Sequence, residues 1–461
     1  MKARGLSLTA ALVLGGCASL LSLDDLKVKE EGAAGASGSS DGTDGGAGAS
    51  GTGGTGGGSA GTGGIGGTGG VAGDAGVAGG GAGGSAGTGG TGGKGGSSGS
   101  SGSSGASGAA GSAGTAGAGG SGPTPLHPPD RPVGDPKPGM GKTLALAARS
   151  LYFGVTDPVT KMPDPTAWKR IGYDIDGKCT SAADSSGSMP GTCKRPPSAT
   201  SDSLTDGDAC RDNNFGSKFL VTLVNLKPDV ETKLASGIDK GASTLMLVIS
   251  DLDTTADDTY APAVLYVVAP WPDDAGIPAW DGKDHRQIDT SSVVNNDITK
   301  PLVVFPKGYV KGNTWVSGDF NKTPSVLPFP YNGSILAIPA ESLTLTVELS
   351  ADHASTKASV LSGAIKSSEF VCALKPALLS QFSCNSTFAQ PFIDQFVSWA
   401  DLSAGAPDFL DTTKTCDAMS IGGALEFVPV KVPAPGDVIT VPVQPNPCFD
   451  GGIPNCFDGG M

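Results

Sequence analysis

The feature that most constrains this chain is a block of glycine in its N-terminal third. Of the 74 glycines in 461 residues, 44 lie between Gly32 and Gly122, a stretch composed almost wholly of Gly, Ala, Ser and Thr. It contains no aromatic residue and only three branched aliphatic residues. Because so little apolar surface is available for burial, the stretch is predicted to be disordered. A flexible coil of this length spans roughly 50–57 Å, so residues 32–122 are interpreted as a tether.

The N-terminus has the pattern of an export signal. Residues 1–16 combine a basic start with the apolar stretch Leu6–Leu14, which is too short to cross a bilayer core of ~30 Å. The sequence Leu14-Gly-Gly-Cys17 that follows resembles the lipobox of bacterial lipoproteins. This resemblance implies cleavage before Cys17, lipid attachment to Cys17 and a lipidated N-terminal segment, residues 17–31. Several acyl chains on one residue give stable membrane attachment.

The net charge of the chain indicates its partners, and the residue after Cys17 indicates its location. Without the signal the chain carries 29 Lys+Arg against 45 Asp+Glu, which disfavours nucleic acid as a partner and leaves membrane contact to the lipid. Ala18 stands where lipoproteins retained in the inner membrane often carry Asp, so the resemblance favours the outer membrane. The expected location is therefore the cell envelope, either periplasmic or exposed at the surface.

The remaining chain is expected to be a proline-rich neck, a folded domain and a tail. The neck, residues 123–142, holds seven prolines between Pro123 and Gly139, and this composition favours an extended, stiff spacer. The folded domain is placed at residues 143–440 and a cysteine-containing tail at residues 441–461. We expect the neck and tether together to hold the domain away from the membrane.

The folded part reads as strands with a few helices. Residues Leu343–Leu349 alternate strictly between apolar and polar side chains, which predicts a strand with one buried and one solvated face. Further strands are predicted at 143–153, 244–249, 263–268, 302–305, 335–338 and 425–432, and helices at 215–226, at 230–238, after Ser367 and after Thr387. Strands and helices do not alternate regularly, so the expected fold class is α+β, built on an antiparallel, jelly-roll-like β-sandwich.

Eight cysteines remain once Cys17 is lipidated, and an even number in an exported chain favours disulfides over zinc, for which no CxxC spacing is present. Four bridges among eight cysteines allow 105 pairings. Proximity along the chain favours Cys179–Cys193, Cys448–Cys456 and Cys384–Cys416, which leaves Cys210–Cys372.

Acidic clusters are the main chemical signal. Asp174 and Asp176 stand two residues apart before a glycine, as in many calcium loops, and Asp206, Asp208 and Asp212 follow nearby. The full EF-hand pattern is absent. Ca²⁺ binding by these five residues is one hypothesis; the alternative makes Asp212 a helix N-cap before Phe215 and the others solvated turn residues.

Tryptophans in acidic, loop-like segments provide a second hypothesis. Trp271, Trp280 and Trp315 lie near aspartates, and carbohydrate sites commonly stack a ring on a sugar face. The alternative is that these rings cover the core under long loops. No catalytic residue is predicted, because His127 lies in the proline-rich neck, and His285 and His353 lie in polar, loop-like segments without a recognisable nucleophile motif.

Two short sequence segments extend the resemblance to bacterial lipoproteins. Residues Trp168–Gly177 and Cys210–Gly216, placed after a lipobox and a glycine-rich tether, are similar to uncharacterised surface lipoproteins of myxobacteria. This likeness implies an exported, lipid-anchored domain and names no activity. The expected function is that of a lipid-anchored envelope protein displaying a disulfide-stapled binding or structural domain, with a polysaccharide or an envelope protein as its partner. The alternative function is a secreted polysaccharide hydrolase using an Asp/Glu pair that no motif identifies.

Overall fold

The computed structural model describes residues 125–136, 138, 141–181, 191–200, 202–226, 228–272, 275–322, 325–331, 334–381, 384 and 386–442. The signal peptide, Cys17, the tether of residues 32–122, and Cys448 and Cys456 lie outside the described residues. The described chain is a mostly-β unit with a few helices.

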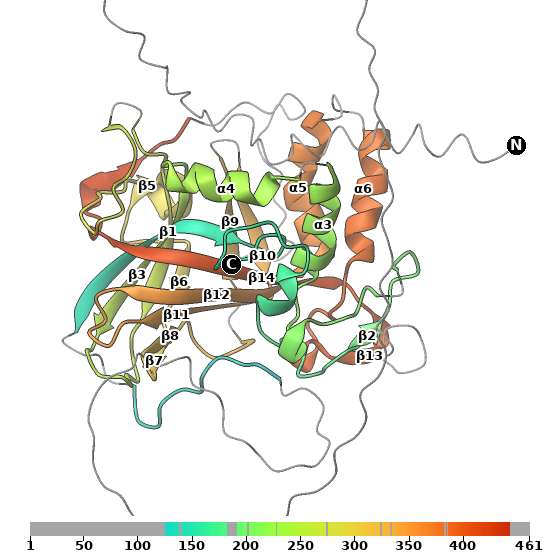
Figure 1. Cartoon of the computed structure of the whole chain (residues 1–461), viewed down its shortest axis with the longest axis horizontal. Coiled ribbons are helices and arrows are strands. Elements are labelled where there is room, and N and C mark those ends of the chain that lie inside the picture. Colours follow the sequence, from blue (N-terminus) through green and yellow to red (C-terminus); the bar gives the residue numbers. More distant parts are fainter. Residues whose placement is uncertain are drawn as a thin grey trace, which may run out of the picture. The chain divides into compact units, whose positions relative to one another are not determined.

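One curled sheet of 11 strands forms the centre of this unit (Figure 1). Its strand order is β15-β5-β4-β3-β1-β14-β12-β11-β8-β7, and β6 also pairs with β4. Neighbouring strands are antiparallel except β15 and β5, which are parallel. The strands of this sheet are β1 (Lys142–Tyr152), β3 (Thr244–Leu252), β4 (Ala263–Val268), β5 (Ile288–Asp289), β6 (Val303–Phe305), β7 (Tyr309–Lys311), β8 (Thr314–Val316), β11 (Ser342–Leu349), β12 (Thr356–Lys366), β14 (Ala418–Val430) and β15 (Val438–Ile439).

Two further pairs of strands accompany the sheet. The first pairs β9 (Ser325–Tyr331) with β10 (Ser334–Ala340), and the second pairs β2 (Cys193–Lys194) in parallel with β13 (Asp411–Thr415).

The sheet differs from the predicted sandwich, which would stack two sheets face to face. Strand β14 joins the two halves edge to edge, because it pairs with β12 along residues 418–425 and with β1 along residues 424–430. The register of β1 against β14 shifts between Ala148 and Ser150, and such irregularities increase the twist of a strand. A curled sheet can enclose much of its own apolar core, as barrels do.

The predicted strands and helices are found, but one predicted face is wrong. Strand β11 covers the alternating segment, yet Thr344 and Thr346 on its supposedly solvated face are buried. The Tyr173 hydroxyl and the Thr346 Oγ1 are 2.8 Å apart and hydrogen-bonded. The segment that contains Tyr173 thus covers the polar face of β11, and it leads directly into the acidic residues described below.

The helices pack together beside the sheet. A π-helical segment, η3 (Phe215–Leu220), continues as α3 (Val221–Leu226); the others are α4 (Val230–Asp239), α5 (Ser367–Gln381) and α6 (Ser386–Ser398). Figure 1 shows α3, α5 and α6 standing side by side, with α4 across β1. Rings of Phe215, Phe219, Phe370, Phe396 and Trp399 meet with centroids 4.8–6.2 Å apart. Their apolar stripes are therefore core faces.

Short 3₁₀ turns connect these elements. They are η1 (Ala167–Arg170), η2 (Asp208–Cys210), η5 (Thr290–Ser292), η6 (Val294–Asn296), η7 (Pro407–Phe409) and η8 (Pro435–Asp437). Among the described residues, no helix combines the length and the apolar character that crossing a membrane requires.

The described part of the proline-rich neck lies against the folded unit instead of standing free as a spacer. Leu126 donates its N–H to the Ala209 carbonyl at 3.1 Å and accepts from the Asp174 N–H at 3.0 Å. Arg131 donates to the Thr259 carbonyl at 3.1 Å and lies 4.4 Å from the Tyr309 ring centroid. The extended chain is therefore part of the fold where it passes the acidic loops.

Candidate functional site

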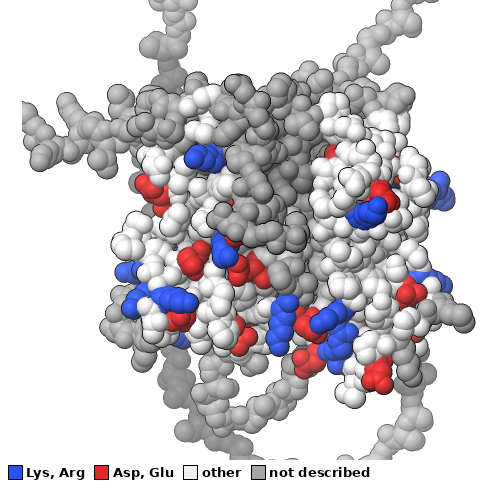
Figure 2. Space-filling view, turned by 180° about the vertical axis from the view of Figure 1, so that it is seen from behind, with Lys and Arg blue, Asp and Glu red and all other residues white. Residues whose placement is uncertain are grey.

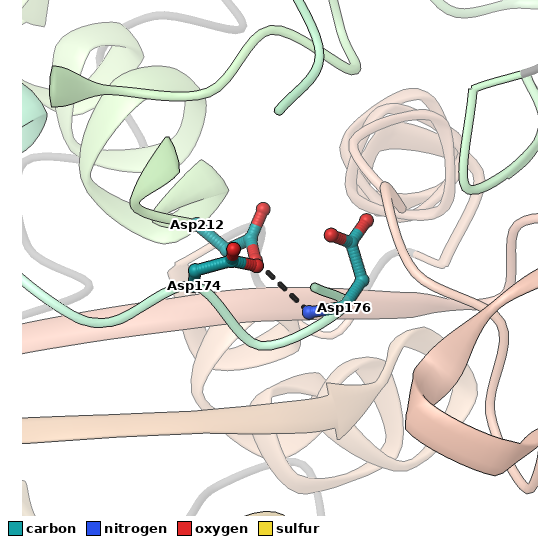
Figure 3. Close-up of side chains that lie close together, drawn as sticks. All are labelled: Asp174, Asp176 and Asp212. Atoms are coloured by element: carbon teal, nitrogen blue, oxygen red, sulfur yellow. Dashed lines mark hydrogen bonds between the residues drawn. The ribbon is translucent and has the colours of Figure 1, made fainter. Parts of the chain in front are cut away.

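Three of the five predicted calcium ligands meet in one buried cluster. Asp174, Asp176 and Asp212 each offer a carboxylate oxygen, and these three oxygens lie within 4.8 Å of one another. The side chains are 0%, 4% and 3% exposed, respectively. Figure 3 shows the carboxylates of Asp174 and Asp212 meeting side by side, with that of Asp176 close by. We call these three residues the acid cluster.

Two loops that are distant in sequence run side by side to build the acid cluster. The Asp212 N–H donates to the Tyr173 carbonyl at 3.0 Å, and the Ile175 N–H donates to Asp212 Oδ2 at 2.6 Å. At the other end of the pair, the Asp206 N–H donates to the Thr180 carbonyl at 3.0 Å. These bonds hold residues 173–180 against residues 206–212.

Local N–H groups orient the carboxylates of the first loop. The Gly177 N–H donates to Asp174 Oδ1 at 2.7 Å, and the Lys178 N–H donates to Asp176 Oδ1 at 2.8 Å. Gly177 has a φ of +71°, which glycine adopts without steric cost. The Asp-x-Asp-Gly spacing therefore forms a tight turn with both carboxylates fixed, as the sequence pattern predicts.

Half-buried Asp206 and buried Asp401 lie near the acid cluster, and the predicted ligand Asp208 is not part of it. Asp206 forms a hydrogen bond with the Asp212 side chain and accepts from the Thr180 N–H at 2.5 Å. Asp401, which no local motif revealed, is 7% exposed, and its negative charge raises the pKa of Asp206 and that of Asp212. Asp208 is exposed and is not part of the acid cluster.

Asp401 belongs to a network that completes the edge of β14. Where β1 no longer pairs with β14, the Ser420 N–H donates to Asp401 Oδ1 at 2.8 Å and the Gly422 N–H to Asn213 Oδ1 at 2.9 Å. A Cβ at Gly422 would lie 2.7 Å from the Ile171 carbonyl oxygen, so only glycine allows this close approach. Backbone donors in a buried strand edge require such partners.

Asp212 is not the helix N-cap of the alternative interpretation. Asn214 occupies the position before η3, and its side chain makes no capping bond to η3. The Asp212 carboxylate accepts from the N–H groups of Ile175 and Asp176 instead. Its orientation therefore serves the contact between the two loops.

Little positive charge opposes burial at these acids: the charge of Lys178 lowers the pKa of Asp176, but burial raises that pKa by more. Burial raises the pKa of Asp174 to about 6, that of Asp176 to about 7 and that of Asp401 to about 7. Burial, followed by repulsion from Asp176, raises the pKa of Asp206 to about 9 and raises the pKa of Asp212 well above its ordinary range.

Surface carboxylates behave in the opposite way. Asp164 pairs with Arg170 at 2.6 Å, and the Arg170 hydrogen bond lowers the pKa of Asp164 to about 2. Figure 2 shows acidic and basic side chains intermixed on one face of the molecule. The aspartates of the acid cluster are thus buried beside other aspartates, while the acidic side chains on the face shown in Figure 2 lie among Lys and Arg side chains.

One carboxylate oxygen in the acid cluster has no hydrogen-bond partner. Oδ2 of Asp174 is buried and unpaired, although the residue is fully enclosed. An unsatisfied buried acceptor costs about 1–3 kcal/mol, and more when charged. This oxygen is therefore available to a cation or to a hydrogen-bond donor.

Two disulfides flank the acid cluster, and their pairing corrects the sequence-based prediction. Cys179 pairs with Cys210, with Cα atoms 4.6 Å apart, and Cys193 pairs with Cys416, with Cα atoms 5.2 Å apart. The predicted pairs Cys179–Cys193, Cys384–Cys416 and Cys210–Cys372 are therefore wrong. Cys372 and Cys384 are disulfide-bonded as well. Proximity along the chain did not predict the pairs correctly, because the fold brings together cysteines from segments that are distant in sequence.

Each disulfide secures a segment of the site. Cys179–Cys210 joins the two loops that carry the acid cluster, and Cys193 lies next to Thr192, whose hydroxyl donates to Asp176 Oδ2. The Cys193 Sγ also contacts the Asp401 carbonyl at 3.3 Å. The two covalent links therefore hold like charges close together.

The three predicted ligand-binding tryptophans do not form one surface. Trp315 is fully buried in the core, and its indole N–H donates to the Ala261 carbonyl at 2.8 Å, so it cannot stack on a sugar. Trp271 and Trp280 lie together around Arg286, whose guanidinium carbon is 5.4 and 5.5 Å from their ring centroids. Both rings are partly exposed. Arg286, 1% exposed, was not identified from the sequence.

Comparison with known proteins gives no match to a family model, to a curated protein or to a solved structure.

Proposed function

We propose that this chain is a lipid-anchored protein of the cell envelope whose disulfide-stapled β domain acts as a binding or structural module on a flexible tether. The observation that carries the proposal is the pair of disulfides, Cys179–Cys210 and Cys193–Cys416, in a β domain that follows an export signal and a lipobox-like sequence. Stable disulfides are typical of oxidising compartments outside the cytoplasm.

The partner is expected to be an envelope polymer or an envelope protein. Two rings, Trp271 and Trp280, are partly exposed in one loop region, and partly exposed rings of this kind can stack on sugar faces. The net charge of the mature chain is strongly negative, and acidic and basic side chains are mixed on the face that Figure 2 displays. Lipid on Cys17 would supply the membrane attachment.

A polysaccharide hydrolase is the second candidate, since paired carboxylates perform such chemistry. The carboxylates that the fold brings closest together, in the acid cluster, are at most 4% exposed. A polymer chain cannot reach a pair buried to this extent. The geometry at the acid cluster therefore favours a binding or structural role over hydrolysis.

Lipidation is tested by expressing the full chain in a Gram-negative bacterium with radiolabelled palmitate. We expect label in the wild-type chain and its recovery with outer-membrane fractions. Cys17→Ser should lose the label, while Cys179→Ser should keep it because that cysteine serves the fold. A wild-type chain that is exported without label would overturn the anchored model.

The hydrolase alternative is tested on the same purified chain. Incubation with bacterial and plant polysaccharides should release no reducing ends, whereas ligand binding should raise the melting temperature. Steady release of reducing ends that disappears in a carboxylate variant would replace the binding model with hydrolysis.

A further inference from the structure

We propose that the acid cluster is a calcium site in which Asp174, Asp176 and Asp212 bind one Ca²⁺ between the loops 173–180 and 206–212. This inference concerns the folded domain and does not depend on the lipid anchor or on the display function.

The unpaired Oδ2 of Asp174 is the observation that points to a ligand. This oxygen is buried in a fully enclosed residue and has no hydrogen-bond donor, while its partner Oδ1 accepts from the Gly177 N–H at 2.7 Å. Carboxylates that bind a metal through one oxygen often accept a hydrogen bond on the other oxygen, which fixes their orientation. Asp174 has this arrangement, with Oδ1 hydrogen-bonded and Oδ2 without a partner. A turn residue that merely capped its own loop would have both oxygens paired or solvated.

Distances among the ligand atoms fit Ca²⁺. The three carboxylate oxygens lie within 4.8 Å of one another. Oxygens at the usual Ca–O distance of about 2.3–2.6 Å from one ion are at most about 4.6–5.2 Å apart. The separations are therefore in the range found between oxygen ligands of one Ca²⁺.

The donor chemistry favours a hard cation. The acid cluster offers only carboxylate oxygens, and the cysteines beside it are closed in disulfides. Thiolate and imidazole ligands, which zinc prefers, are not part of the acid cluster. A set of oxygen-only donors suits Ca²⁺, which tolerates irregular coordination geometry.

Covalent and hydrogen-bonded supports hold the site ready for an ion. The Cys179–Cys210 disulfide crosses between the two ligand loops, and the Ile175 N–H fixes the Asp212 carboxylate at 2.6 Å. Three buried negative charges repel one another at these separations unless protons or a cation neutralise them. A divalent ion would relieve that repulsion and bridge the loops.

The test uses the full chain, freed of metal with EDTA and dialysed, with CaCl₂ as the titrant in calorimetry and ⁴⁵Ca²⁺ in equilibrium dialysis. We expect about one Ca²⁺ per chain and a melting temperature that rises with CaCl₂. Asp176→Asn and Asp212→Asn, which preserve side-chain shape, should weaken binding at least tenfold.

The matched control is Asp208→Asn, in the same loop but exposed. It removes the same charge from the chain, so it should bind Ca²⁺ as the wild type does. Equal loss in Asp208→Asn and Asp176→Asn would mean that Ca²⁺ responds only to overall charge, and this would overturn the site.

Direct binding to the wild type keeps the proposal falsifiable even where a variant fails to fold. A folded wild-type chain that takes up no ⁴⁵Ca²⁺ at millimolar concentration overturns the inference. Undiminished binding in the folded double variant Asp176→Asn/Asp212→Asn overturns it as well. A chain that takes up no radiolabelled palmitate would contradict the lipid anchor but would leave the calcium result unaffected. The two proposals can therefore fail separately.

Discussion

Two buried charged groups, the acid cluster and Arg286, occupy different parts of the same fold and are stabilised in different ways. Arg286 is flanked by the rings of Trp271 and Trp280, and its Nη2 donates to the Ala242 carbonyl at 3.1 Å. Asp284 lies near enough to raise its pKa, although burial lowers that pKa to about 10. The aspartates of the acid cluster face other aspartates.

The difference between them separates structural charge from charge available to a ligand. Indole faces attract a cation with about 0.5–2 kcal/mol each, so a single guanidinium between two rings is already stabilised. Nε and Nη1 of Arg286 also lack a hydrogen-bond partner, but two rings face that cation, whereas the three carboxylates of the acid cluster repel one another and one of their acceptors is unpaired. The buried arginine is therefore read as a packing element, and the aspartates as a cation site.

The largest expected effect is the pH dependence of stability without calcium. A carboxyl whose pKa is raised on folding stabilises the fold below its unfolded pKa, near 4, and this stabilisation is lost as pH rises through the folded value. For Asp401, with a pKa of about 7, the loss approaches about 4 kcal/mol above that pH, and the pKa values of Asp174 and Asp176 are raised in the same direction.

Denaturant unfolding of the full chain in EDTA, from pH 4 to pH 8, measures this. The free energy of unfolding should fall across the range, and CaCl₂ should remove part of the fall. Stability that increases steadily with pH in EDTA would show that these carboxylates are already balanced.

Breaking the long-range disulfide should come next. Cys193→Ala with Cys416→Ala removes a link between residues 223 positions apart, and loss of a native disulfide typically costs about 2–5 kcal/mol. The melting temperature should fall and calcium affinity should weaken, because Thr192 and Asp401 lose a neighbouring anchor. A double variant with wild-type stability and wild-type calcium affinity would contradict the role given to this bridge.

Arg286→Ala probes the other side of the comparison. It removes the guanidinium between two rings and opens a cavity, at a cost of about 2–4 kcal/mol. Calcium binding by the folded variant should stay unchanged, since the arginine contacts two tryptophan rings and the Ala242 and Ala269 carbonyls, which are outside the acid cluster. A change in calcium affinity without unfolding would couple the two regions, contrary to the distinction drawn above.

Calcium itself should stabilise the wild type by about 2.7 kcal/mol at 100 times its dissociation constant. The shift is read from thermal melts of the wild type and Asp208→Asn, and it should be nearly absent in Asp176→Asn. An equal shift in all three chains would assign the effect to another site.

The smallest effect is expected from neutralising one acid in the absence of calcium. Asp176→Asn removes repulsion with Asp174 and should raise the free energy of unfolding in EDTA at pH 8 by about 1 kcal/mol. Destabilisation of the folded variant in EDTA would mean that the Asp176 charge is required by hydrogen bonds such as that from Thr192.

Local patterns predicted the elements well. The alternation of Leu343–Leu349 corresponds to β11, and the helical stripe after Ser367 corresponds to α5. The Asp174-x-Asp176-Gly177 turn also follows from nearest neighbours, because a side chain and an N–H two or three residues away form it. Such features depend on a few adjacent residues and on backbone geometry.

Long-range arrangements could not be predicted in this way. The buried state of Thr344 and Thr346 depends on a segment about 170 residues earlier that covers β11. The position of Asp401 near the acid cluster depends on its hydrogen bond to the edge of β14 that β1 leaves unpaired. No sequence motif surrounds Asp401. The curled single sheet depends on which strand edges pair, and many pairings share the same alternation.

By itself, the sequence determined the contrast between a glycine-rich segment and a core-forming domain, the positions of strands and helices, and the local acidic turn, because composition and short-range periodicity encode these directly. Only the tertiary structure decided which cysteines pair, which tryptophan is core and which aspartates meet. Those outcomes depend on burial and on contacts between distant segments, and the free energy of such contacts appears only when the whole sheet is assembled.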